Sequence, residues 1–190
     1  ADFAAPPDPA AISAALGLPA GMDRDRLLAQ VFTGDESDLF DALLPLLDRG
    51  KSTDVKLATK LRDGDWRDPS MTDFWLLAGC LLTGGSAKTP FTAKIGSLPT
   101  KDLRIGPAAP FMPQLEDLMA RVQDARPAAL ALESVQATLA LHRFGHAFCS
   151  RLARRKAAHG WLDFDDLILS TARLLDESSM AQWVLFRLDG

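Results

Sequence analysis

The sequence predicts an all-α protein, an irregular helical bundle with one long helix in its C-terminal half and a long loop rich in Pro and Gly. Apolar residues recur at steps of three and four in several segments, and no segment has the alternation of a convincing strand. After Pro127, residues 128–158 contain no helix breaker except Gly145, whereas residues 96–113 hold six Gly or Pro residues. With 190 residues the chain can bury one substantial core, or one domain and a fragment of another.

The charge is distributed unevenly along the chain. The net charge of −4 argues against a wholly basic nucleic-acid binder. Residues 1–50 carry nine acidic and three basic side chains, which predicts a solvated acidic face. Residues 51–104 carry nine basic and six acidic ones. Residues 143–159 carry five Lys or Arg and no acid, so the basic charge is concentrated there.

Composition also indicates where the protein works. The two cysteines form no CxxC pair, which fits a reducing compartment. No apolar run reaches the length of a membrane span, and no signal peptide opens the chain. We therefore expect a cytoplasmic protein without membrane contact. The opening, rich in Ala and Pro and without an initiator Met, suggests a segment cut from a longer protein.

Periodicity places several helices in the first half of the chain. They are expected over residues 10–16, 23–32, 37–47, 52–61 and 72–82. Pro45 should limit or kink the third of them. Ser52 or Thr53 should cap the fourth. The fifth is strongly apolar, which predicts a buried helix.

The loop at residues 82–89 is glycine-rich and contains Lys88, but it does not fit a P-loop. The two glycine positions of that motif hold Leu82 and Ala87, and no strand precedes them. Lys88 and Lys94 belong to a basic segment that continues to Arg104. This segment could touch a nucleic-acid backbone, although a solvated loop is the favoured interpretation.

The C-terminal half should begin with a helix over residues 114–125, followed by a second one that starts at Pro127 and reaches residue 158. In the second helix, His142, His146 and Cys149 lie at i, i+4 and i+7 on an otherwise apolar stripe. That spacing could begin a zinc site, but no fourth ligand is evident. We favour burial of all three side chains in helix packing, and a Cys–His nucleophile pair is less favoured still.

The end of this long helix carries the strongest local indication of function, a group of basic side chains. Its basic side chains are Arg143, Arg151, Arg154, Arg155 and Lys156. They could simply complement the helix dipole and aid solubility. Alternatively, they could contact DNA phosphates. No aromatic residues alternate with them, so sequence-specific reading of bases is not predicted.

One helix should end and another should begin within residues 159–168. Gly160 should end the long helix, and Asp163 should cap the next one with Asp166 as its capping-box partner. Asp163, Asp165 and Asp166 could also be considered as metal ligands. Because side chains at i, i+2 and i+3 do not all converge on one face, that alternative is disfavoured.

The same stretch resembles the AddA-type members of the UvrD/RecB group of DNA helicases. The matching motif is Leu162, Asp163, Phe164, Asp165, Asp166, Leu167 and Ile168, preceded by a basic helix end and a Gly. Residues 183–190 are also similar to that family. Weaker similarity covers residues 50–61 and 81–94.

The resemblance implies that residues 1–160 form the helical insertion usually named 1B, and that residues 161–190 begin the return into the RecA-like motor domain 1A. The parent would be a 3'-5' DNA helicase and exonuclease of recombinational repair, with ATP, magnesium and an AddB-type partner. This chain carries neither a Walker A loop nor the DEAQD box, so we expect no catalytic residue, metal site or cofactor in it. The expected role is a DNA-guiding arm; the alternative is a structural or protein-binding insertion without DNA contact.

Overall fold

The computed structural model describes residues 7–176, 183, 186 and 187, and it confirms the all-α class. The helices are α1 (Pro9–Ala15), α2 (Arg24–Val31), α3 (Glu36–Leu47), α4 (Ser52–Leu61), α5 (Met71–Leu81), α6 (Lys101–Arg104), the 3₁₀ helix η1 (Ala109–Phe111), α7 (Met112–His159) and α8 (Phe164–Asp176). An isolated antiparallel bridge joins Leu82 to Ala93, and the described residues contain no strand.

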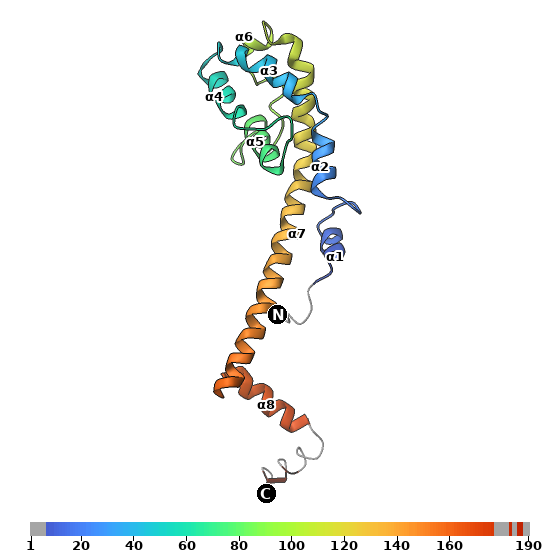
Figure 1. The fold of residues 1–190 in the computed structure, drawn as a ribbon, viewed down its shortest axis with the longest axis vertical. Coiled ribbons are helices and arrows are strands. Elements are labelled where there is room, and N and C mark those ends of the chain that lie inside the picture. Colours follow the sequence, from blue (N-terminus) through green and yellow to red (C-terminus); the bar gives the residue numbers. More distant parts are fainter. Residues whose placement is uncertain (1–6, 177–182, 184–185, 188–190) are drawn as a thin grey trace. The chain divides into compact units, whose positions relative to one another are not determined.

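The chain forms two compact units, which we describe separately. The N-terminal unit comprises residues 7–138, and the C-terminal unit comprises the described residues from Leu139 onward. In the N-terminal unit, α3 packs on α4, and α5 packs on both α4 and α2. Figure 1 shows these helices gathered beside the first turns of α7.

The core of the N-terminal unit lies between those helices and α7. Its fully buried side chains include Phe40, Phe74 and Leu77. The first part of α7 contributes the stripe that the periodicity predicts: Leu115, Leu118, Met119 and Val122 are all fully buried. Each such side chain contributes about 1.5–3 kcal/mol relative to an exposed one, so this stripe holds α7 to the bundle.

The start of α4 differs from the expected cap. Lys51, rather than Ser52 or Thr53, is the N-cap residue. The buried Asp54 carboxylate accepts a hydrogen bond from the Lys51 backbone N–H at 3.0 Å and another from the Thr100 hydroxyl at 2.6 Å. One carboxylate thus satisfies a helix end and anchors a distant loop, and no side-chain cap from residue 52 or 53 is needed.

Two prolines lie inside helices that they were expected to end or begin. Pro45 is within α3, and Pro127 is within α7 rather than at the start of a separate helix. An interior Pro removes a backbone hydrogen bond and costs about 3 kcal/mol. Around Pro127, Ala125, Ala129 and Leu132 are buried. Packing on both sides of the proline therefore offsets its local cost.

The segment of residues 96–113 is not the long loop that its Pro and Gly content predicts. It contains α6 and η1, and Leu103, Ala108 and Met112 are buried. The backbone N–H of Thr100 also donates to Asp54 at 2.9 Å. Three apolar anchors and one buried carboxylate fix this segment to the bundle despite its many Gly and Pro residues.

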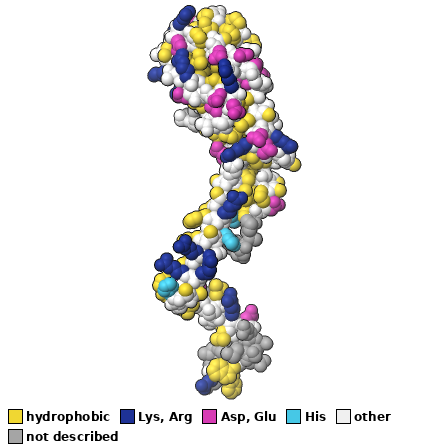
Figure 2. Space-filling view, viewed as in Figure 1, with side chains coloured by type: hydrophobic (Ala, Val, Ile, Leu, Met, Phe, Trp, Pro, Cys, Tyr) yellow, Lys and Arg dark blue, Asp and Glu magenta, His cyan; other side chains and the backbone are white. Residues whose placement is uncertain are grey.

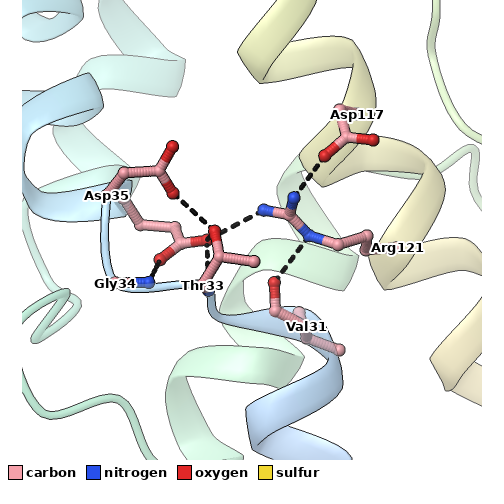
Figure 3. A network of polar contacts seen from close by, with 7 residues as sticks. Val31, Thr33, Gly34, Asp35, Asp117 and Arg121 are labelled. Carbon is pink, nitrogen blue, oxygen red and sulfur yellow. Dashed lines mark hydrogen bonds and ion pairs between the residues drawn. The ribbon is translucent and has the colours of Figure 1, made fainter.

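One acid of the N-terminal region is buried, in contrast to the predicted solvated face. Glu36 is 1% exposed and forms an ion pair with Arg121 of α7 at 2.8 Å. The Arg121 Nε donates to the Val31 carbonyl at 2.8 Å, and Asp117 binds the same guanidinium (Figure 3). Glu36 also accepts the backbone N–H of Gly34. This network joins the α2–α3 turn to α7.

In the C-terminal unit, α7 ends and α8 begins where the sequence predicts a helix end and a new helix. Gly160 has a φ of +64°, the left-handed conformation that ends α7. The backbone N–H of Asp166 donates to the Asp163 carboxylate at 2.9 Å, and the N–H of Asp163 donates to the Asp166 carboxylate at 3.0 Å. This reciprocal capping box starts α8.

Candidate nucleic-acid interface

The last turns of α7 carry an exposed basic surface, which we name the arginine face. It consists of Arg143, Arg151, Arg154 and Arg155, all exposed. At about 100° per residue, these four positions lie within an arc of about 120°. Figure 2 shows Lys and Arg side chains gathered over this part of α7. Four guanidinium groups on one side of a helix form a surface suited to a row of phosphates.

Among these arginines, the structure gives Arg154 a contact within its own helix: its Nε donates to the Ser150 carbonyl at 3.3 Å. In the described part of the chain no carboxylate lies within ion-pair distance of the arginine face. Its positive charge is therefore available to an anion from outside.

Lys156, the fifth basic residue predicted at this helix end, has a different environment. Its ammonium group forms ion pairs with Asp163 and with Asp166, the latter at 2.7 Å. Hydrogen bonds to Asp163 and then Asp166 raise the pKa of Lys156, and Lys156 lowers the pKa of Asp163. Lys156 thus holds the end of α7 to the cap of α8, which neutralises its charge locally.

The seven residues 162–168, on which the resemblance rests, divide by role. Asp163 and Asp166 form the capping box, whereas Leu162, Phe164, Leu167 and Ile168 are at least half exposed. Asp165 is an exposed acid in the first turn of α8, where it suits the helix dipole. No three His, Cys, Asp or Glu side chains of the described residues are grouped to hold a metal. Most of the similar segment at residues 183–190 lies outside the described residues.

Apolar side chains lie next to the arginine face. Phe144 and Phe148 stack with ring centroids 6.0 Å apart, and both are more than half exposed. Leu141 and Leu152 continue this stripe along α7, and α8 buries none of its side chains. The C-terminal unit therefore presents an apolar surface of a kind that usually marks a contact.

The predicted burial of the His–Cys stripe is wrong. His146 and Cys149 are exposed, and His142 is half-buried. The same stripe is buried at Leu132 and Val135, within the N-terminal unit. The spacing correctly placed these residues on one face, but periodicity cannot say where along a helix its packing partners end.

The two lysines predicted in the basic loop also differ from each other. Lys88 is exposed, whereas Lys94 is half-buried and donates to the Cys80 carbonyl at 2.7 Å. Burial lowers the pKa of Lys94, and the nearby Lys60 lowers it further. The loop of residues 83–92, which carries Lys88, is closed because the Thr83 N–H donates to the Thr92 carbonyl at 2.8 Å.

Sequence reasoning missed one cation–aromatic pair. The Arg126 guanidinium lies 3.5 Å from the centroid of the Phe91 ring. These residues are far apart in sequence, and only the folding of the loop onto α7 brings them together. No local signal in either segment could have predicted this contact.

Comparisons of the chain with models of known protein families, with curated proteins and with solved structures found no match. No helix in the described part of the chain is long and apolar enough to cross a membrane.

Proposed function

We propose that this chain is the helical insertion of an AddA-type DNA helicase–nuclease subunit and that it guides DNA as a passive arm. The observation that carries the proposal is the arginine face, which exposes four guanidinium groups on one side of α7 with no ion-pair partner among the described residues. The resemblance at residues 162–168 supplies the family. ATP, magnesium and the AddB-type partner belong to the parent, and hydrolysis of ATP or DNA is not proposed for this chain.

The proposed mechanism is electrostatic. Each guanidinium that neutralises a phosphate releases condensed counterions, so the affinity depends on salt and not on base sequence. Lys156 has a supporting role because its ion pairs fix the end of α7. Arg143, Arg151, Arg154 and Arg155 make the contacts.

The test compares two double variants in anisotropy titrations with a forked DNA. R151E/R154E should weaken binding and reduce the slope of log K against log salt by about 2, since each phosphate contact contributes about 0.9. R49E/R67E changes the net charge equally but alters exposed positions of the N-terminal unit. If both variants lost the same DNA affinity, the net charge alone would explain the loss, and the proposal would be overturned.

A second candidate function is contact with a protein, and the exposed apolar surface of the C-terminal unit favours it. Phe144, Phe148, Trp161 and Phe164 are each more than half exposed. Such large apolar side chains are favoured as anchors in protein interfaces. The surface would receive an AddB-type subunit or the rest of the parent motor. F144S/F148S should then abolish capture of that partner and leave DNA affinity unchanged.

A further inference from the structure

Two adjoining pockets open on the surface of the N-terminal unit. The first, of about 250 Å³, lies between α4, α5 and the segment that follows α5. The second, of about 320 Å³, lies between α5, the loop of residues 83–94 and α7. Gly79 and Lys94 line both pockets. A Cβ added at Gly79 would meet nothing within 4 Å, so the junction between the pockets is open.

The first pocket is built to attract an anion. Thr53, Lys56 and Lys60 lie at i, i+3 and i+7 on one face of α4, and Lys94 faces them from the neighbouring segment. In the described part of the chain none of these three lysines has an ion-pair partner. Like charges converge here, and a bound anion would relieve their repulsion.

Lys94 is the best placed of the three. Its ammonium group uses one donor on the Cys80 carbonyl at 2.7 Å, which fixes its position and leaves two donors for a ligand. The burial that lowers its pKa also removes competing water. Two apolar side chains, Leu57 and Leu98, also line the pocket.

The second pocket differs from the first because planar side chains line it. Trp75, Phe91 and Arg126 line it, and the Arg126 guanidinium covers one face of the Phe91 ring. Phe91 has a φ of +57°, which is unusual for a bulky residue, and hydrogen bonds between the loop and Thr83 hold it there. Planar groups of this kind stack on nucleobases.

We propose that the two pockets together bind one nucleotide unit. The phosphate lies among Lys56, Lys60 and Lys94, and the base lies beside Trp75, Phe91 and Arg126. The unit is either a free mononucleotide or one residue of a single strand, because both present the same chemistry. This site goes beyond the arginine face, since every residue that lines it belongs to the N-terminal unit.

The experiment measures anisotropy of a fluorescein-labelled dT12 strand and competition by dTMP, with all variants made in an R151E/R154E background. That background reverses two of the four charges of the arginine face, and the variants then test whether the remaining binding depends on the pockets, so failure of the DNA-guiding role and failure of this site are distinguishable. K56E/K60E should weaken binding at least about tenfold, as expected when hydrogen bonds to charged groups are lost. Displacement by dTMP at comparable affinity would identify a free nucleotide, and its absence would identify the strand.

Gly79→Leu gives a test that does not change charge. Leucine fits the backbone there, so helix content by circular dichroism should stay unchanged while the junction between the pockets is obstructed. Binding of dT12 and dTMP should fall at least about tenfold, whereas Ala137→Leu, at an exposed position of α7 that lines neither pocket, should leave it unchanged. The proposal is overturned if neither probe binds the R151E/R154E protein, or if Gly79→Leu and K56E/K60E bind both as tightly as that protein does.

Discussion

Glu36 shows how one buried charge can organise a turn. Its carboxylate receives the Arg121 guanidinium and the backbone N–H groups of Thr33 and Gly34. Nothing in the local pattern distinguishes it from its acidic neighbours, because its partner is 85 residues away. A buried carboxylate persists only when such partners satisfy it.

Glu36→Ala should therefore lower the free energy of unfolding by about 3 kcal/mol, since it removes the buried one of the two carboxylates that pair with Arg121 and the acceptor of two backbone N–H groups. Urea denaturation measures the change. Asp38→Ala, at an exposed position of the same helix, is the matched control and should change stability by less than about 1 kcal/mol. If both variants lost the same free energy of unfolding, the hydrogen bonds and ion pair of Glu36 would contribute nothing beyond the charge of an acid at the start of the helix.

Asp73 connects stability to pH. Burial alone would raise the pKa of Asp73, but hydrogen bonds from Ser70 and Asp65 outweigh burial and lower the pKa below 3.8. A lowered pKa in the folded state means that the stabilisation is present above about pH 4 and is lost as pH falls through that folded value.

Asp73→Asn should thus cost about 0.5–2 kcal/mol at pH 7, as loss of a helix cap does. The difference from the unchanged protein should shrink in urea denaturation near pH 2.5. A difference that stays constant between the two pH values would contradict the assignment of the carboxylate charge.

At the scale of elements, periodicity located α2, α3, α4, α5 and the first part of α7 because each of them buries one face. Leu115, Leu118 and Met119 recur at helical spacing and are fully buried. The sequence was less informative where tertiary packing outweighs local preference. Pro127 continues a helix instead of starting one, and Leu103 anchors a segment whose composition suggests a loop. The capping box of Asp163 and Asp166 was predictable because its two residues are only three positions apart in the sequence.

Pro127→Ala restores a backbone donor inside α7 and should raise stability by about 1–3 kcal/mol. Pro113 lies in the first turn of α7, where proline is tolerated, so Pro113→Ala should be nearly neutral. Urea midpoints compare the two. Destabilisation by Pro127→Ala would mean that the packing around it depends on a bend that only proline provides.

At the scale of the whole chain, the candidate sites fall in different units. The arginine face could be predicted from composition, because basic residues without acids are visible in the sequence. The two adjoining pockets could not, because Lys60, Lys94 and Arg126 come from three separate segments. The exposed His146 and Cys149 also required the structure, since exposure depends on which elements reach that part of α7.

The central claim is that the arginine face binds DNA phosphates, and the salt dependence of binding tests it most directly. Anisotropy titration of the chain with forked DNA should give a slope of log K against log salt between about −3 and −4, as four phosphate contacts require. Absence of binding at the lowest salt, or a slope near zero, would contradict the account and leave the apolar surface of the C-terminal unit as the functional one.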